Sequence, residues 1–167
     1  MSDTFKKITR RVLAHASASV SSRASRGRTP QTQDEDSSKP CLRILVAEDE
    51  HISRLFLSRV LGKFGHEVKS VKNGREVLEV LENHETFDAL LTDIQMPEVD
   101  GVELARVLRS DSRYRTHADL PIIAMSAYAM SGDRERFLKE GMDEYISKPI
   151  DPKLLAIILQ KVIVKAQ

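Results

Sequence analysis

Residues 42–49 of this chain read LRILVAED, an apolar run over Leu42–Ala47 that ends in two acidic side chains. A short apolar run of this kind predicts a strand that is covered on both faces of its sheet. The segments FDALLT at 87–92 and PIIAMS at 121–126 are similar apolar runs. Strands buried on both faces belong to parallel sheets whose connections are helices. These three runs therefore predict an α/β domain with a mainly parallel sheet.

The segments around these runs complete an alternation of five strands and five helices. The predicted strands are residues 42–47, 67–71, 87–92, 121–126 and 144–147. Apolar residues at helical spacing predict helices over 52–64, around 77–81, over 101–109, over 133–140 and from 152 to about 164. Gly65 and Gly141 suit helix C-termini, Asp100 suits an N-cap and Pro152 suits a first helical turn.

The composition restricts the class of protein. Residues 41–167 hold eighteen Lys and Arg against twenty-one Asp and Glu, so this part lacks the clustered basic surface of a nucleic-acid-binding domain. No apolar run reaches the roughly 20 residues that a membrane span needs. The single cysteine, Cys41, fits a reducing compartment. We therefore expect a cytoplasmic protein that binds neither membrane nor nucleic acid.

Residues 1–40 differ from the rest of the chain. They are rich in Ser and Arg, and the first thirty hold seven Lys and Arg against one acid. This composition cannot bury enough apolar surface to fold and predicts a disordered extension. A docking segment or a targeting peptide is an alternative, because transit sequences are also poor in acids and rich in Arg and Ser. The expected organisation is a basic, Ser- and Arg-rich extension at 1–40 and a folded domain at 41–167.

Polar side chains stand at the ends of four predicted strands. Glu48 and Asp49 follow the first strand, Asp93 follows the third, and Ser126 and Lys148 mark the ends of the fourth and fifth. Ligands of open parallel sheets bind at the carboxyl ends of the strands. Three carboxylates there repel one another unless a cation lies among them, and oxygen ligands suit Mg²⁺ or Mn²⁺. A lysine and a hydroxyl beside such a cation can hold a phosphoryl group, which an Asp carboxylate can accept.

Each of these residues has an ordinary structural explanation when it is taken alone. An Asp at a strand end is commonly a turn residue, and the acidic run Glu48–Glu50 suits the N-terminus of the first helix. Lys148 suits an exposed turn before proline, and Ser126 suits a loop. Their occurrence at matching positions of one alternating pattern favours a joint site.

The segment Leu42–Val164 resembles the receiver domain of two-component response regulators. The matching motifs are ILVAEDE at 44–50, DIQMPEVDG at 93–101, IIAMSA at 122–127 and YISKP at 145–149. The stretch 127–148 resembles receivers that are fused to hybrid histidine kinases. The resemblance implies a flavodoxin-like, doubly wound five-stranded parallel sheet of order 2-1-3-4-5 with five helices.

The resemblance also implies a nucleophile and a set of metal ligands. Asp93 would be the phospho-acceptor, taking its phosphoryl group from a phosphohistidine on a partner protein. Glu48 and Asp49 would hold Mg²⁺ or Mn²⁺ together with Asp93 and the backbone carbonyl of Gln95.

Four further residues would bind the phosphoryl group and report its presence. Lys148 would pair with the phosphoryl oxygens, and Ser126 would hydrogen-bond to them. Pro149 would hold the Lys148 loop, commonly through a cis peptide bond. Tyr145 would turn inward when Ser126 moves, although an ordinary half-buried strand aromatic is the alternative for this residue.

The chain departs from the family pattern at several positions. Glu48 stands where Asp is commoner, so it would reach the cation through a water, and Ser126 stands in place of Thr. Gln95 and Tyr128 lie two residues beyond Asp93 and Ser126, at positions that influence dephosphorylation in this family. A tyrosine at 128 would shield the phosphoryl group from water and predicts a long-lived phosphorylated form.

Two other functions share the alternation of strands and helices. A dehalogenase-like phosphatase or phosphotransferase also uses an Asp nucleophile, but that family has a second Asp two residues later, where this chain has Gln95. A flavin-binding flavodoxin-like domain has a hydroxyl-rich loop after its first strand, where this chain has acids.

We therefore expect a phospho-accepting response regulator of a phosphorelay. We do not expect an enzyme, beyond self-phosphotransfer and autodephosphorylation. The expected partners are a histidine kinase or histidine phosphotransfer protein and a downstream protein target, because no output domain follows the last predicted helix.

Overall fold

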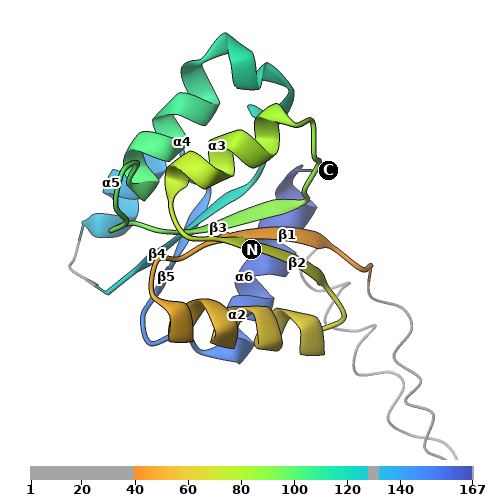
Figure 1. Ribbon diagram of the computed structural model, residues 1–167. Coiled ribbons are helices and arrows are strands. Elements are labelled where there is room, and N and C mark those ends of the chain that lie inside the picture. Colours follow the sequence, from red (N-terminus) through yellow and green to blue (C-terminus); the bar gives the residue numbers. More distant parts are fainter. Residues whose placement is uncertain (1–39, 128–131, 167) are drawn as a thin grey trace, which may run out of the picture. The chain divides into compact units, whose positions relative to one another are not determined.

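The computed structural model describes residues 40–127 and 132–166. Its centre is a sheet of five strands, in which all four neighbouring pairs are parallel and the order is β2-β1-β3-β4-β5 (Figure 1). The strands are β1 (Arg43–Ala47), β2 (Glu67–Val71), β3 (Ala89–Asp93), β4 (Ile122–Ser126) and β5 (Glu144–Ser147). This is the doubly wound, flavodoxin-like order that the resemblance implied.

Helices cover both faces of the sheet. Figure 1 shows α2 (His51–Lys63) and α6 (Pro152–Ala166) on one face and α3 (Gly74–Glu82), α4 (Gly101–Ser110) and α5 (Asp133–Lys139) on the other. The two faces bury separate apolar clusters, because neighbouring side chains of a strand point to opposite sides. Leu45 and Leu90 pack under α3 and α4, whereas Ile44 and Leu91 pack under α2 and α6. The predicted burial of β1, β3 and β4 on both faces is confirmed.

The helix ends agree with the predicted caps. Asp100 accepts hydrogen bonds from the N–H groups of Val102 and Glu103, both at 2.8 Å, and so begins α4. Gly65 and Gly141 follow α2 and α5 with φ angles of 84° and 94°, which glycine adopts without a steric cost.

Two predictions about the elements need correction. β3 begins two residues later than predicted and includes Asp93, so the proposed nucleophile is the last strand residue and not the first loop residue. The sequence analysis also missed a 3₁₀ segment, η1 (Ser112–His117), between α4 and β4. This segment is polar and lacks an apolar period, although Tyr114 within it is fully buried.

Arg109 ties the end of α4 to the start of β4 and β5. Its guanidinium donates to the carbonyls of Ala118, Leu120 and Gly141 and to the carboxylate of Asp143, at 2.7 to 3.0 Å. Burial lowers the pKa of this guanidinium, while the Asp143 carboxylate raises it, and the net shift is downward. The network lies at the amino ends of the strands, opposite the edge where ligands bind in such sheets.

A second ionic group lies at the outer strand β5. The Glu144 carboxylate is buried and accepts hydrogen bonds from Arg134 on α5, at 3.0 Å, and from Lys161 on α6. It also accepts the N–H of Tyr145, at 3.4 Å. These contacts, which we call the Glu144 clamp, join α5, β5 and α6.

Among the described residues, no helix is both long and apolar enough to cross a bilayer. The extension expected at 1–40 lies, apart from Pro40, outside the described residues.

Candidate functional site

The parallel register brings the predicted site residues to one edge of the sheet. Ala47 on β1 is level with Thr92 on β3, so Glu48 and Asp93 follow at neighbouring positions. Asp93 is in turn level with Met125 on β4, one residue before Ser126. The strand ends therefore place side chains from distant parts of the sequence side by side, as predicted.

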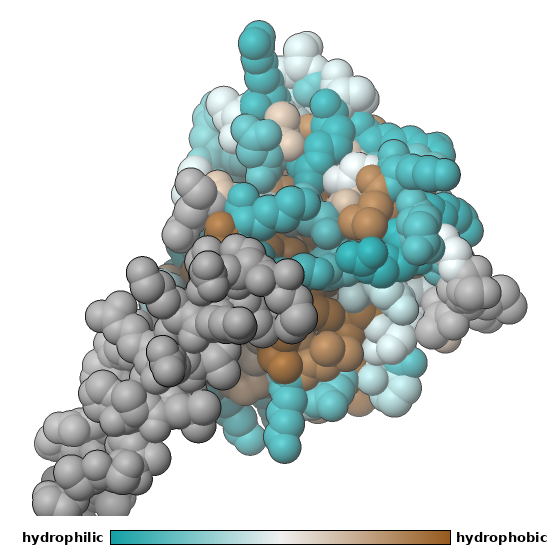
Figure 2. Space-filling view, turned by 180° about the vertical axis from the view of Figure 1, so that it is seen from behind, coloured by the Kyte–Doolittle hydropathy of each residue, from teal (hydrophilic) through white to brown (hydrophobic). Residues whose placement is uncertain are grey.

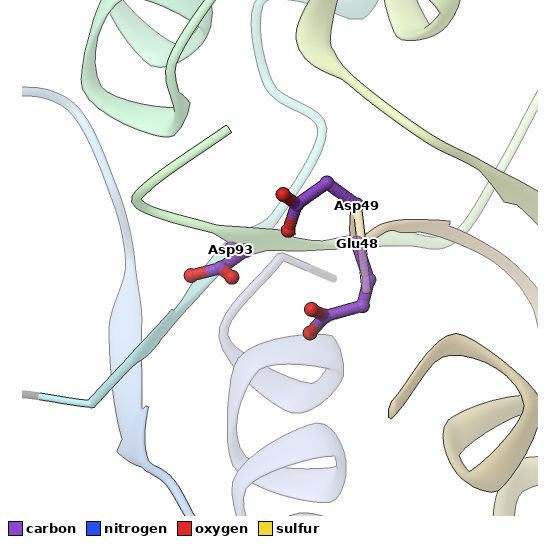
Figure 3. Close-up of side chains that lie close together, drawn as sticks. All are labelled: Glu48, Asp49 and Asp93. Carbon is purple, nitrogen blue, oxygen red and sulfur yellow. The ribbon is translucent and has the colours of Figure 1, made fainter. Parts of the chain in front are cut away.

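Three carboxylates converge at this edge. Ligand atoms of Glu48, Asp49 and Asp93 all lie within 4.8 Å of one another, and Figure 3 shows the three side chains gathered around the ends of β1 and β3. Glu48 is fully buried, Asp93 is 7% exposed, and Asp49 is open to solvent. Two buried acids beside a solvent-facing third acid form a site that is negative inside and accessible from one side.

Lys148 contacts two of the three acids. Its ammonium donates a hydrogen bond to Asp93 Oδ2 at 2.6 Å and lies 2.8 Å from Glu48 Oε2. The second contact is an ion pair between the ammonium and a carboxylate that is fully buried. The sequence analysis predicted Lys148 beside Asp93, but it did not predict the contact of Lys148 with Glu48.

The pKa values of this group shift with burial and with charge. Burial raises the pKa of the Glu48 carboxyl, the Lys148 ammonium lowers it, and the net shift is upward. Burial lowers the pKa of Lys148, but its contacts with Asp93 and Glu48 outweigh burial and raise it. The lysine is therefore held as a cation, while Glu48 is an acid whose negative charge lacks full compensation.

Ser126 and Lys148 are joined through the backbone. The N–H of Lys148 donates to the carbonyl of Ser126 at 2.8 Å, and the Ser126 side chain is buried. The Lys148–Pro149 peptide bond is cis, the form that the resemblance implied. The structure thus places Asp93, Ser126 and Lys148 at the ends of three adjacent strands.

The loop after β3 is compact around Asp93. The N–H of Gln95 donates to Asp93 Oδ1 at 3.3 Å, and the N–H of Gly101 donates to the carbonyl of Ile94 at 3.0 Å. A Cβ at Gly101 would lie 2.3 Å from the carbonyl oxygen of Asp93, so glycine is required there. A cleft of about 640 Å³ lies beside this loop, and its lining includes Asp49 and Gln95.

Arg54 is a contributor that the sequence analysis missed. Its guanidinium donates to the backbone carbonyls of Glu48 and Asp49, at 2.7 and 3.0 Å. Arg54 lies on the first turn of α2, so it fixes the backbone from which both acids project. Its position one helical turn after the acidic run was the only signal in the sequence.

The structure describes one of the two tyrosines that the sequence analysis singled out, Tyr145, but not the other, Tyr128. Tyr145 is half-buried on β5, and its ring centroid lies 6.3 Å from that of Phe137 on α5. This position agrees with either role considered for it, a moving switch or a packed strand residue. Tyr128 lies outside the described residues.

The donor set fits a divalent cation. All three side chains offer oxygen atoms, one of them accessible to solvent, which is the ligand type that Mg²⁺ and Mn²⁺ take in proteins. Glu48 and Asp93 also share the single ammonium of Lys148, so the three acids together carry more negative charge than this lysine neutralises.

Comparisons with known proteins agree with this geometry. Residues 44–160 match the sequence profile described as the response regulator receiver domain. The chain is 35% identical over 127 residues to hybrid signal transduction histidine kinase I of Dictyostelium discoideum, which covers 74% of this chain but only 7% of that protein. It is also 35% identical over 116 residues to the polar-differentiation response regulator DivK of Brucella anthropi, covering 69% of this chain and 91% of DivK.

A solved structure supports the same assignment. The receiver domain of the sensor histidine kinase PA1611 from Pseudomonas aeruginosa, which has a magnesium ion in its active-site cleft, superposes with a TM-score of 0.65 at 33% identity. The match covers 75% of this chain and 99% of that domain. The sequence profile, the relatives and the fold thus agree, and the chain belongs to the family of response regulator receiver domains of two-component systems.

Proposed function

We propose that this receiver domain accepts a phosphoryl group on Asp93 from a phosphohistidine of a partner kinase or phosphotransfer protein. The observation that carries the proposal is the Lys148–Asp93 contact of 2.6 Å beside two further carboxylates. A dehalogenase-like phosphatase finds no support in the comparisons, and Gln95 stands where that chemistry needs a second Asp.

Each residue of the site has its own role in the proposed phosphotransfer. A carboxylate oxygen of Asp93 forms the new P–O bond as the P–N bond to the donor imidazole breaks, and the bonding electrons leave with the imidazole. Lys148 exchanges its contact with Asp93 for one with a phosphoryl oxygen, and Ser126 donates a hydrogen bond to another. Glu48, Asp49, Asp93 and the Gln95 carbonyl would hold a divalent cation, which would neutralise charge on the phosphoryl oxygens.

The face of α2 next to the site suits the docking of the donor. Ile52, Leu55 and Phe56 are exposed apolar residues that begin three positions after Asp49. Figure 2, which shows the molecule from behind, has apolar side chains gathered on its lower part, where α6 lies in Figure 1. Neither helix contains an acid, so the face would suit a partner surface with apolar residues and acids.

The experiment that tests the function is labelling by acetyl phosphate, together with beryllofluoride binding, in the presence of Mg²⁺. We expect the wild-type protein to be labelled and Asp93→Asn to be unlabelled but folded. Ser147→Ala, a change at the end of β5, is the control and should retain labelling. Equal labelling of wild type and Asp93→Asn would refute the assignment of the nucleophile.

A cytoplasmic location and the absence of turnover chemistry belong to the same proposal. The support is that the comparisons are with receiver domains of signalling proteins. A generic phosphate ester should therefore not be turned over by the purified chain.

A further inference from the structure

The loop from Ile94 to Asp100 contains an unusual backbone conformation. Glu98 has φ = 67°, in the left-handed region that side chains other than glycine rarely adopt. Among the described residues, His84 is the other non-glycine residue with a positive φ, at 59°. A residue of this kind persists only where its surroundings hold it, and such residues occur at binding sites.

Two polar contacts hold Glu98 in this conformation. Its Oε2 accepts a hydrogen bond from Arg75 Nε at 2.7 Å, and its Oε1 accepts one from Asn73 Nδ2 at 3.0 Å. Asn73 is buried, and its own side-chain oxygen accepts the N–H of Glu76, which begins α3. We call Glu98, Asn73 and Arg75 the Glu98 clasp.

The backbone beside the clasp is joined to the same helix start. The N–H of Gly74 donates to the carbonyl of Val99 at 3.1 Å. A Cβ at Gly74 would lie only 2.6 Å from that carbonyl oxygen, so a larger residue at position 74 would push the two segments apart. The tip of the loop is therefore fixed on the N-terminus of α3 at two consecutive residues.

The base of the loop is closed as well. Gly101 donates to Ile94 and lies directly against the carbonyl of Asp93. Gln95 thus stands between a closed base and a fixed tip, although its own side chain is exposed. The segment that carries its carbonyl is thus held by hydrogen bonds at both ends.

We propose that the Glu98 clasp is a positioning device that presets the Gln95 carbonyl for the divalent cation. The inference rests on the proposed function, because the cation and this ligand are part of that proposal. A preset ligand does not have to be ordered when the cation binds, so the cation binds more tightly. Glu98, Asn73 and Arg75 are not among the proposed ligands of the cation and would act only through the loop.

The test compares two substitutions to glycine. Glu98→Gly removes the clasp carboxylate and relieves the positive φ, while His84→Gly relieves a positive φ at the end of α3, away from the loop. We expect Glu98→Gly to raise the dissociation constant for Mg²⁺ by roughly tenfold, measured by titration calorimetry, because residues that orient a metal ligand have effects of this size. Arg75→Gln should weaken binding in the same direction, and His84→Gly should bind as the wild type does.

A second measurement needs no cation. Hydrogen exchange of the backbone amides of Gln95, Met96 and Val99 should be faster in Glu98→Gly than in wild type, and unchanged in His84→Gly. The melting temperatures of all variants report whether an effect on Mg²⁺ comes from global unfolding.

The outcomes separate the inference from the proposed function. If the wild type binds Mg²⁺ and Glu98→Gly binds it equally well, the clasp has no positioning role and the function stands. Equal weakening by Glu98→Gly and His84→Gly also overturns the inference, because the effect would then follow relief of backbone strain in general. A wild-type protein that binds no Mg²⁺ overturns the proposed function and the inference together.

Discussion

Replacing Lys148 with methionine should destabilise the protein when no divalent cation is present. The ammonium lies 2.6 Å from Asp93 Oδ2 and 2.8 Å from Glu48 Oε2, and each contact is worth about 6 kcal/mol of Coulomb attraction at an effective dielectric constant of roughly 20. Most of this attraction offsets the cost of removing three charges from water. Removing one partner of a buried ion pair costs about 3–5 kcal/mol. Because the lysine side chain is 23% exposed, we expect the free energy of unfolding to fall by about 3 kcal/mol, at the lower end of this range.

The assay is urea unfolding of wild type and Lys148→Met, each in EDTA and in excess Mg²⁺. A cation bound among the carboxylates replaces the missing ammonium charge, so Mg²⁺ should stabilise the variant more than it stabilises the wild type. Lys153→Met, an exposed lysine at the start of α6, is the matched control and should behave as the wild type. The reasoning fails if Lys148→Met is as stable as wild type in EDTA, or if Mg²⁺ stabilises both proteins by the same amount.

Three further predictions concern other parts of the domain. Phe56→Asp should slow phosphotransfer from a phosphohistidine protein by about tenfold without changing labelling by acetyl phosphate, because an interface residue of this kind contributes about 1–2 kcal/mol of binding free energy. Val164→Asp, at the far end of α6, is the control. Equal slowing by both substitutions would refute a specific docking face. Burial raises the pKa of Glu144, but the hydrogen bonds from Arg134 and Lys161 outweigh burial and lower it. The ionised Glu144 therefore stabilises the folded protein above the unfolded pKa near 4.5, and this stabilisation is lost as the pH falls through the folded pKa. Urea unfolding from neutral to acidic pH should therefore show a larger loss of unfolding free energy in wild type than in Glu144→Gln, and parallel curves would contradict this. Arg109→Leu should lower the free energy of unfolding by about 3 kcal/mol, because the Arg109 guanidinium holds several backbone carbonyls. The dissociation constant for Mg²⁺ should not change, since these contacts lie at the opposite edge of the sheet from the carboxylates. A weaker Mg²⁺ affinity in the folded variant would contradict this prediction.

The sequence predicted most of the fold because its signals are local. Apolar runs marked β1, β3 and β4, and the alternation with helices indicated a parallel sheet. The polar segment Ser112–His117 has no apolar period, so its 3₁₀ turns depend on contacts such as the buried Tyr114 that no short window contains.

The site was predictable as a set of positions but not as a set of contacts. The strand-end rule brought Asp49, Asp93 and Lys148 together. It did not predict that Lys148 would share its charge with Glu48, because that depends on how far each side chain extends. Glu98 gave no signal in the sequence, since a positive φ is usually marked by glycine and here it is held by contacts from α3.

The Glu144 clamp has a consequence for how the protein behaves at high concentration. The sheet ends at β5, and the outer strand of a sheet can pair with a strand from another molecule and start aggregation. The Glu144 carboxylate accepts a hydrogen bond from the N–H of Tyr145 and holds the side chains of Arg134 and Lys161 beside this strand. An incoming strand would have to separate a buried acid from two cations before it could pair. The clamp that joins the two helices thus also protects the sheet from growing beyond its fifth strand.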